Sequence, residues 1–189
     1  MRVISGSVKG RNLKAVPGMN TRPTTDKVKE AIFSMIGPYF DGGLVLDLFA
    51  GAGGLGIEAI SRGLERGIFV DIERASVDTI KQNLLSTGLM VHAEVYRNSA
   101  EQALKVLQRR ELKFDLIFID PPYRMKNMDE LLLVVEERHL FAVGAKVVLE
   151  HDARTLYAER IGQLIRIRKA EYGETAISIY EWMEGDIIQ

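Results

Sequence analysis

The sequence predicts an α/β fold in which a mostly parallel sheet of about seven strands carries helices on both faces. Five short runs rich in Val, Ile, Leu and Phe follow one another, at 44–49, 67–72, 93–98, 115–120 and 145–150. The segments between them have the apolar spacing that is typical of helices, at 55–62, 74–87, 99–109 and 127–137. Strands that alternate with helices form βαβ units and therefore a parallel sheet.

The last part of the chain departs from this alternation. Residues 164–182 hold two stretches of alternating apolar and polar side chains on either side of Gly173. This pattern predicts an antiparallel β-hairpin rather than another crossover. We therefore expect the parallel sheet to end in an antiparallel pair.

The beginning of the chain is predicted to add a small extension to this sheet. Residues 2–16 alternate apolar and polar side chains around two glycines, which indicates a β-hairpin. A helix is expected to follow, capped by Thr24 or Thr25 and ended by the Gly-Pro pair at 37–38.

Charge is distributed unevenly along the chain, although the net charge is only −1. The first 30 residues carry seven Lys or Arg and two acidic residues, whereas the rest carry 18 basic and 24 acidic residues. A basic arm on an acidic body indicates a polyanionic partner at one end, and a solvated N-terminus is the alternative. We divide the chain into a basic hairpin-and-helix extension, residues 1–40, and a main domain, residues 41–189.

Composition excludes several classes of protein. No apolar run approaches the roughly 20 residues of a membrane-spanning helix, and the N-terminus lacks the apolar region of a signal peptide. The absence of cysteine excludes disulfides, cysteine-ligated zinc and a thiol nucleophile, and it is compatible with a cytoplasmic protein. His92, His139 and His151 lie far apart without ligand spacing, so we predict no metal site.

A glycine-rich turn follows the first predicted strand. In DLFAGAGGLGIEA, Gly51, Gly53 and Gly56 match G-x-G-x-x-G between a strand and a helix. The glycines allow a tight turn and a close approach of a ligand to the backbone, beside the free N–H groups of a helix N-terminus. Asp71 ends the next strand 20 residues after Gly51, where a carboxylate accepts hydrogen bonds from a ribose diol.

Two cofactors fit this turn. NAD would place its pyrophosphate on the turn, whereas S-adenosylmethionine (SAM) has no phosphate and would lay its adenosine and methionine parts across it. Asp47 lies at the carboxyl end of the first strand, where it would repel a pyrophosphate and attract an ammonium group. The sequence therefore favours SAM, and a turn that needs glycine only for packing is the alternative.

The strand at 115–120 ends in the sequence DPPY. Asp120 falls at the carboxyl end of a central strand, where open α/β sheets bind their ligands. Pro121 and Pro122 have a fixed φ and no N–H, so the turn offers the Asp120 carboxylate and backbone carbonyls as acceptors. Tyr123 adds an aromatic face, on which a base can stack for about 1–3 kcal/mol.

This set of acceptors suits a planar ring that bears an exocyclic amino group. The lone pair of that nitrogen is delocalised into the ring, which makes it a poor nucleophile. Two acceptors that hold its two N–H bonds favour the transition state in which the lone pair turns toward an electrophile. The sulfonium methyl of SAM is such an electrophile. An ordinary strand-to-loop stop is the alternative, because Asp-Pro is common in turns.

The chain resembles a known family over nearly its whole length. The glycine turn, the acid at Asp71 and DPPY are similar to the motifs of class I amino-methyltransferases, which have a Rossmann-like fold. The segments RVISGSVKGRNL, TRPTTDKVKEAIFSMI, VLEHD and EYGETAISIYEW resemble the bacterial 16S rRNA guanine-N2 methyltransferases of the RsmD type. The resemblance implies a monomeric, cytoplasmic enzyme that methylates the 2-amino group of a guanine in small-subunit rRNA. The substrate would be an assembled or assembling 30S particle.

The motifs and the resemblance together assign residues to three parts of a site. The catalytic residues would be Asp120, Pro121, Pro122 and Tyr123. The residues that bind the cofactor would be Asp47, Phe49, Ala50, Gly51, Gly53, Gly56, Asp71, Ile72, Asn98, Ser99, Ala100 and Asp120. The residues that bind RNA would be Arg2, Lys9, Arg11, Arg22, Thr24, Lys27, Tyr123 and Arg124. The chain departs from many members of the family at 97–100, where Arg-Asn-Ser-Ala replaces an acid next to the adenine.

Other functions stay open at the level of the sequence. Another methyltransferase of the DPPY type would act on DNA adenine or on a protein glutamine, but glutamine enzymes typically carry Asn in place of Asp120. A DNA enzyme usually brings a target-recognition domain, for which 189 residues leave little room. An NAD-linked oxidoreductase and a non-catalytic ribosome-assembly factor would keep the same fold. Glu150 could line the site or cap a loop, and the polar loop at 124–128 could form a lid.

Overall fold

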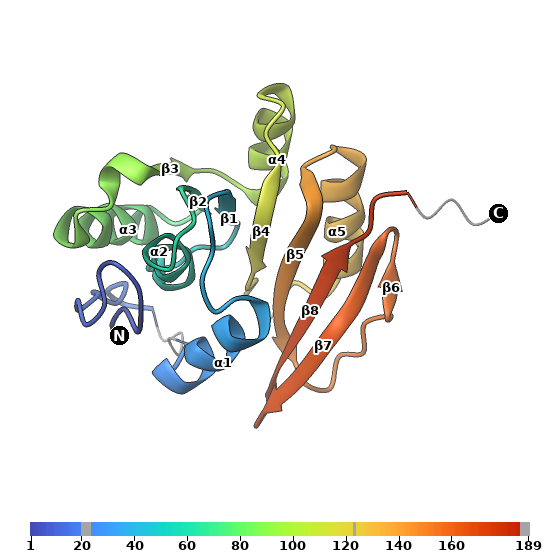
Figure 1. The fold of residues 1–189 in the computed structure, drawn as a ribbon, viewed down its shortest axis with the longest axis horizontal. Coiled ribbons are helices and arrows are strands. Elements are labelled where there is room, and N and C mark those ends of the chain that lie inside the picture. The colour runs from blue at the N-terminus through green and yellow to red at the C-terminus, as the bar shows by residue number, and fades with distance from the viewer. Residues whose placement is uncertain (20–23, 123, 186–189) are drawn as a thin grey trace.

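The computed structural model describes residues 1–19, 24–122 and 124–185, which contain an eight-stranded sheet with helices on both sides (Figure 1). The strands are β1 (Leu44–Asp47), β2 (Arg66–Asp71), β3 (Ala93–Arg97), β4 (Phe114–Ile119), β5 (Phe141–Asp152), β6 (Arg160–Ile161), β7 (Leu164–Tyr172) and β8 (Thr175–Trp182). The helices are α1 (Asp26–Ile36), α2 (Gly54–Ser61), α3 (Arg74–Thr87), α4 (Ala100–Arg109), α5 (Met128–Glu137) and a short 3-10 helix, η1 (Met90–His92).

The order of the strands across the sheet is β3-β2-β1-β4-β5-β8-β7-β6. The first five are parallel, and β8, β7 and β6 continue the sheet in antiparallel pairs. The chain runs outward from β1 to β3 and then crosses back to place β4 on the other side of β1 (Figure 1). Open α/β sheets bind ligands at such a switch point, outside the carboxyl ends of the strands. The topology therefore directs attention to the ends of β1 and β4.

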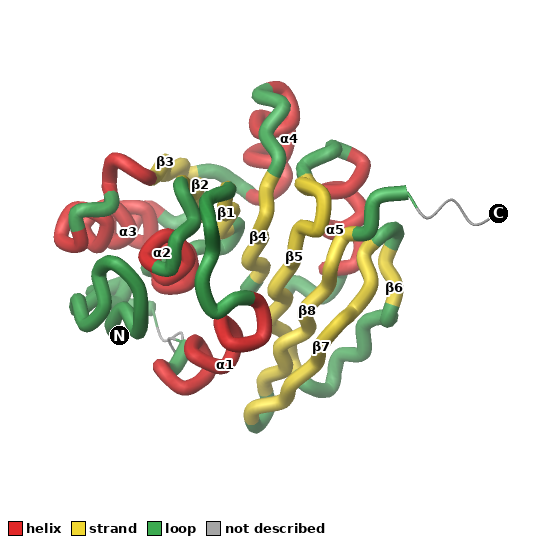
Figure 2. Tube along the Cα trace, viewed as in Figure 1, coloured by secondary structure: helices red, strands yellow, loops and turns green. Residues whose placement is uncertain are grey.

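Helices α1, α2 and α3 cover one face of the sheet, and α4 and α5 cover the other (Figure 2). Successive side chains of a strand point to opposite faces, so each central strand contributes to both cores. Val45 of β1 and Phe118 of β4 pack on the α1–α3 side, whereas Leu46 and Ile119 pack on the α4–α5 side. Burial on both faces explains why these strands read as continuous apolar runs in the sequence.

Helix α1 begins where the sequence predicts. Thr25 is its N-cap, and the Thr25 hydroxyl oxygen accepts from the Val28 N–H at 3.3 Å. Phe33 is fully buried and packs against Phe118 of β4, with ring centroids 5.8 Å apart. This aromatic contact holds α1 against the strand that leads to the DPPY motif.

The helices predicted between the strands are confirmed to within one or two residues, and the terminal hairpin is confirmed as β7 and β8. The sheet has eight strands rather than about seven, because the two-residue strand β6 pairs with the start of β7. Within the described ranges, no helix is long and apolar enough to span a membrane.

The predicted N-terminal β-hairpin is present in a much shorter form than residues 2–16. Backbone hydrogen bonds join residues 1–3 to residues 10–13 in antiparallel pairing. Arg2 and Asn12 form an isolated bridge, and turns occupy most of the chain between them. The physical reason is that the backbone of this segment bonds to helix α2 instead of forming a long ladder. The Ile4 and Ser5 N–H groups donate to the carboxylate of Glu58, at 2.9 and 3.0 Å.

The N-terminal extension shares its core with the sheet. Val3, Leu13 and Ile32 belong to the same buried cluster as the strand residues Val45 and Phe118. The division of the chain near residue 40 stays a prediction.

Candidate active site

Three acidic residues come together at the carboxyl ends of β1, β4 and β5. Asp47 pairs with Phe118 in the β1–β4 register, so Asp120 follows two residues later on the same face. Ile119 pairs with Leu149 in the β4–β5 register, which places Glu150 beside Asp120. The fold thus joins the predicted cofactor turn to the DPPY motif at the switch point of the sheet.

The glycine-rich turn between β1 and α2 is tied to the strands on both sides of β1. The Leu48 N–H donates to the Phe118 carbonyl of β4 at 3.2 Å, and the Ala50 N–H donates to the Val70 carbonyl of β2 at 2.9 Å. These bonds fix the turn at the carboxyl end of the sheet, where the first N–H groups of α2 can donate to a ligand.

Gly56 lies in the first turns of α2, where the helix meets the sheet. A Cβ at this position would lie 2.4 Å from the Phe69 ring and 3.1 Å from a carboxylate oxygen of Asp47. Only glycine therefore allows this close approach of helix and strand, which is a known role of the third glycine of the motif.

Asp47 is an unusually buried carboxylic acid, with 3% of its surface exposed. It accepts the Gly56 N–H at 3.1 Å. Burial raises the pKa of Asp47 to about 7, the negative charge of Asp71 adds to this effect, and the Gly56 hydrogen bond opposes it. A cation bound nearby would favour the ionised form, so Asp47 is suited to a positively charged ligand.

Asp71 anchors the turn, a role that the sequence did not reveal. Its two carboxylate oxygens accept the Gly51 N–H and the Glu73 N–H, both at 2.9 Å. Each oxygen has a second lone pair, which a ribose hydroxyl could use. The predicted contact with a ribose stays a prediction, and the carboxylate is already held in place for it.

The segment after β3 lies at the same edge of the sheet. The Asn98 N–H donates to the Asp71 carbonyl, and the Asn98 side-chain oxygen accepts the Ser99 N–H, both at 3.0 Å. The Ser99 hydroxyl caps α4 by accepting the Gln102 N–H at 3.3 Å, and Ala100 begins that helix. Because Ser99 serves the helix, Asn98 is the stronger candidate for a contact with an adenine edge.

Two apolar residues predicted to bind the cofactor differ in exposure. Phe49 is partly buried and packs against the core on the α4–α5 side. Ile72 directly follows Asp71 and has 61% of its surface exposed. Ile72 is therefore accessible beside the predicted ribose position, and its contact with an adenine ring stays a prediction.

The turn after β4 is described for Asp120, Pro121 and Pro122, and Tyr123 lies outside the described residues. The Pro122 carbonyl accepts the Met125 N–H at 2.9 Å, so it already serves the turn. The hydrogen bonds of the described residues place no donor on the Pro121 carbonyl. The Asp120 carboxylate and the Pro121 carbonyl are therefore the acceptors that remain for a ligand. Of the two proline carbonyls that the sequence suggests, we expect only that of Pro121 to contribute.

Two further acids at this edge have pKa values above their usual range. Burial is the main cause that raises the pKa of Asp120 well above its usual range, and the charges of Glu150 and Asp47 add to it. Burial also raises the pKa of Glu150. A carboxylate with a raised pKa is a strong hydrogen-bond acceptor when ionised, as an amino substrate requires.

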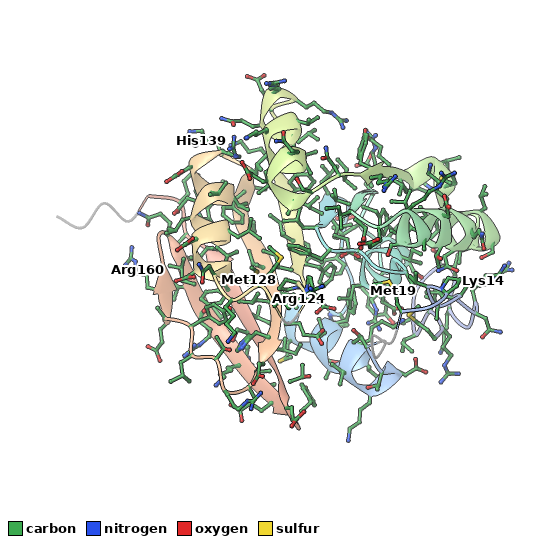
Figure 3. The ribbon with its side chains drawn as sticks, turned by 180° about the vertical axis from the view of Figure 1, so that it is seen from behind. Lys14, Met19, Arg124, Met128, His139 and Arg160 are labelled. Carbon is green, nitrogen blue, oxygen red and sulfur yellow. The ribbon has the colours of Figure 1, made fainter. Side chains whose placement is uncertain are left out.

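The basic residues predicted to bind RNA are spread over the N-terminal segment and the loop after β4. Arg2, Lys9, Arg11, Lys27 and Arg124 are exposed, Thr24 is half-buried, and Arg22 lies outside the described residues. Figure 3 shows Arg124 where β4 ends, near Met128 at the beginning of α5.

Two of the N-terminal charges are engaged within the protein. The Arg2 side chain pairs with Asp26 at 2.8 Å. Lys29 is buried, so it is unavailable to RNA although it contributes to the basic composition of this segment.

Glu58 of α2 links the N-terminal segment to the cofactor turn, and sequence reasoning missed it. Besides the two N-terminal N–H groups, its carboxylate bonds to the Arg62 guanidinium at 2.8 Å and pairs with the Lys29 ammonium at 3.5 Å. All three side chains are buried. The sequence does carry one signal for this role. Glu58 lies within an otherwise apolar helix, and a glutamate that is buried there needs hydrogen-bond or charged partners.

Asn83 of α3 forms a second link of this kind. Its side-chain oxygen accepts the Lys14 N–H at 2.8 Å, and its amide nitrogen donates to the Lys14 and Ala52 carbonyls at 3.0 and 2.9 Å. Asn83 thus joins the N-terminal segment, α3 and the glycine turn.

His92 and His139 are exposed and His151 is buried, in agreement with their predicted surface or packing roles. The His151 ring hydrogen-bonds with the Ser178 hydroxyl and the Asp152 carbonyl, both at 2.9 Å. Strand alternation places His151 on the face opposite Glu150. His139 lies at the far end of α5 (Figure 3).

The sequence is similar to one family of proteins over most of its length. A family profile described as "Conserved hypothetical protein 95" matches residues 1–181. "Putative rRNA methyltransferase YlbH" of Bacillus subtilis is 54% identical, over 96% of this chain and 98% of that protein. "Ribosomal RNA small subunit methyltransferase D" of Escherichia coli strain K12 is 30% identical, over 80% of this chain and 75% of that protein.

A solved structure matches almost the whole fold. "Putative methyltransferase yhhF from Escherichia coli" superposes with a TM-score of 0.84 and 27% identity, over 98% of this chain and 99% of that one. The family profile matches 181 residues, and the identity to YlbH is 54%. Both findings agree with the fold and with the two motifs at the switch point. The chain therefore belongs to the RsmD/YlbH family, the Conserved hypothetical protein 95 family.

Proposed function

We propose that this protein is a SAM-dependent rRNA methyltransferase that modifies the 2-amino group of a guanine in 16S rRNA. The observation that carries the proposal is the juxtaposition of Asp47, at the glycine turn, with Asp120 and Pro121 at the adjacent strand end. One strand end suits a cationic ligand, and its neighbour offers acceptors for an amino group.

The residues of the glycine turn fit SAM better than a dinucleotide. Asp47 faces the start of α2 and would oppose a pyrophosphate there, whereas it would attract the ammonium group of SAM. Asp71 would bind the ribose, and Asn98 and Ile72 would contact the adenine. When bound there, SAM supplies a methyl group activated by its sulfonium charge.

Asp120 and Pro121 would orient the accepting nitrogen. Each accepts one hydrogen of the guanine 2-amino group, which holds the nitrogen in place and turns its lone pair toward the methyl group. If bound SAM donated its methyl group here, an N–CH3 bond would form as the S–CH3 bond broke, and positive charge would pass from sulfur to nitrogen. The Asp120 carboxylate stabilises that charge and is placed to take the proton that must then leave.

The rRNA target is supported by the names of the relatives and by the basic N-terminal segment. The YlbH relative is named for rRNA and the Escherichia coli relative for the small ribosomal subunit. Exposed Lys9 and Arg11 carry positive charge on the N-terminal segment, which suits the phosphates of a folded RNA. A 30S particle as substrate and a monomeric enzyme complete the proposal.

The test uses purified protein, labelled SAM and 30S particles from cells that lack the modification. We expect labelled N2-methylguanosine in digested 16S rRNA, and a rate at least 100-fold lower for Asp120→Asn at saturating SAM. Asp129→Asn, at an exposed position of α5, is the matched control and should retain the wild-type rate. Label in adenine, in protein or in no product would contradict the proposal.

A further inference from the structure

Glu150 occupies the position beside Asp120, and no step described above uses it. The β4–β5 register pairs Ile119 with Leu149, so the next residues along the two strands are Asp120 and Glu150. Neighbouring strands lie about 4.8 Å apart, which is within the reach of one planar base. The two side chains therefore present carboxyl groups side by side at the substrate end of the site.

Glu150 is half-buried, and it lacks the partners that the buried acids Asp47 and Glu58 have. Its Oε2 atom is buried and has no hydrogen-bond partner among the described residues. By contrast, Asp47 accepts the Gly56 N–H, and Glu58 accepts two backbone N–H groups as well as the Arg62 guanidinium. A buried oxygen without a donor is disfavoured unless a ligand supplies one.

Guanine carries the matching donors. Its N1–H and its 2-amino group are adjacent on one edge of the ring and together provide three N–H bonds. In adenine and cytosine the ring nitrogen beside the amino group is instead an acceptor, which an ionised carboxylate would repel. Three acceptors in a row, from Asp120, Pro121 and Glu150, thus match guanine alone among the four bases.

We propose that Glu150 is the residue that selects guanine, by accepting the N1–H while Asp120 and the Pro121 carbonyl accept the two hydrogens of the 2-amino group. This inference rests on the proposed function, because it concerns the same base in the same site. Glu150 is a specificity residue, and the methyl transfer itself is oriented by Asp120.

The test compares two bases at the modified position, which is first mapped with the wild-type protein. One is guanine, and the other is 2-aminopurine, which keeps the 2-amino group but has an acceptor at N1. Semisynthetic 16S rRNA that carries either base is assembled into 30S particles, and single-turnover rates are measured. The wild-type protein should prefer guanine at least 100-fold.

Glu150→Gln is the decisive variant, because an amide can donate to N1 of 2-aminopurine as well as accept from guanine. We expect its preference for guanine to fall at least tenfold, through slower guanine methylation and faster 2-aminopurine methylation. Glu150→Asp should retain the preference, and Glu130→Gln, at an exposed position of α5, should match the wild type. SAM affinity within twofold of wild type shows that each variant is folded.

The outcomes separate the two proposals. An unchanged base preference in Glu150→Gln, or an equal loss on both bases, overturns the role of Glu150 and leaves the methyltransferase proposal standing. If the wild-type protein forms no N2-methylguanosine on 30S particles, both proposals fall.

Discussion

Replacement of Glu58 by Gln should destabilise the fold severely, because Glu58 is the common partner of two buried cations. Its carboxylate lies 2.8 Å from the Arg62 Nε atom and 3.5 Å from the Lys29 Nζ atom, and all three residues are at most 5% exposed. Gln would remove the negative charge and would turn an amide N–H toward one of the donors that the carboxylate accepts.

The magnitude follows from the cost of leaving a buried charge without its partner. Breaking a buried ion pair from one side costs about 3–5 kcal/mol. For a domain of 150–250 residues, each kcal/mol corresponds to about 2–4 °C in Tm, so we expect a decrease of roughly 6–20 °C. Burial already lowers the pKa of Lys29, against the attraction of Glu58, which indicates how strongly the ammonium depends on that partner.

Urea and thermal unfolding of the purified protein would measure this change. Lys29→Met is the informative comparison, since it removes one buried charge and leaves Glu58 with the Arg62 guanidinium and two backbone donors. We expect Lys29→Met to cost less than Glu58→Gln. The exposed substitution Glu130→Gln should be neutral. A loss below about 1 kcal/mol in Glu58→Gln would refute the claim that this cluster joins the N-terminal segment to the domain.

Four further predictions concern the cofactor turn and the basic segment. Burial raises the pKa of Asp47 to about 7, so below this pH Asp47 must release its proton before it can pair with a cationic ligand. SAM affinity should therefore rise about tenfold from pH 6 to pH 8. Calorimetry at both pH values tests this, and Asp47→Asn should abolish the dependence; an equally steep dependence in that variant would count against the assignment. The pKa is 3.8 for an ordinary Asp and about 7 for Asp47 in the folded apoprotein, so the Asp47 contribution to the free energy of unfolding falls as pH rises from about 4 to about 7. In urea titrations across this range, Asp47→Asn should therefore show a smaller decrease in the free energy of unfolding than the wild type. Gly56→Ala should weaken SAM binding at least tenfold, because its Cβ would collide with the Phe69 ring at 2.4 Å, and wild-type affinity would show that the helix can shift freely. Lys9→Ala with Arg11→Ala should weaken binding to 30S particles and reduce its salt dependence while SAM affinity stays unchanged; an unaltered salt slope would remove these residues from the RNA contact.

The parts of the fold with strong local signals could be predicted from the sequence. The sequence predicts the helix at 74–87 with the ends that the structure shows, because apolar periodicity and the glycine after it define both limits. The glycine turn and DPPY were recognisable because each needs particular residue types in consecutive positions. The order of the strands, by contrast, comes from long-range pairing, and only that order shows that the two motifs are neighbours.

The predictions that failed or fell short involve partners distant in the sequence. The N-terminal alternation predicts a longer hairpin than the short pairing of residues 1–3 with 10–13. The carboxylate of Glu58, more than 50 residues away, instead accepts the N–H groups of Ile4 and Ser5. Asp71 was expected to serve a ribose, and its bonds to the Gly51 and Glu73 N–H groups were not visible in the spacing. Tertiary hydrogen bonds decided both cases, and periodicity carries no information about them.

The measurement that tests the central claim most directly is mass mapping of 16S rRNA from cells with the protein, cells without it, and cells that carry Asp120→Asn. The account predicts one guanine that bears an N2-methyl group only in cells with the wild-type protein, and an unmodified guanine at that position in the other two. Identical 16S rRNA modification in all three strains would contradict it.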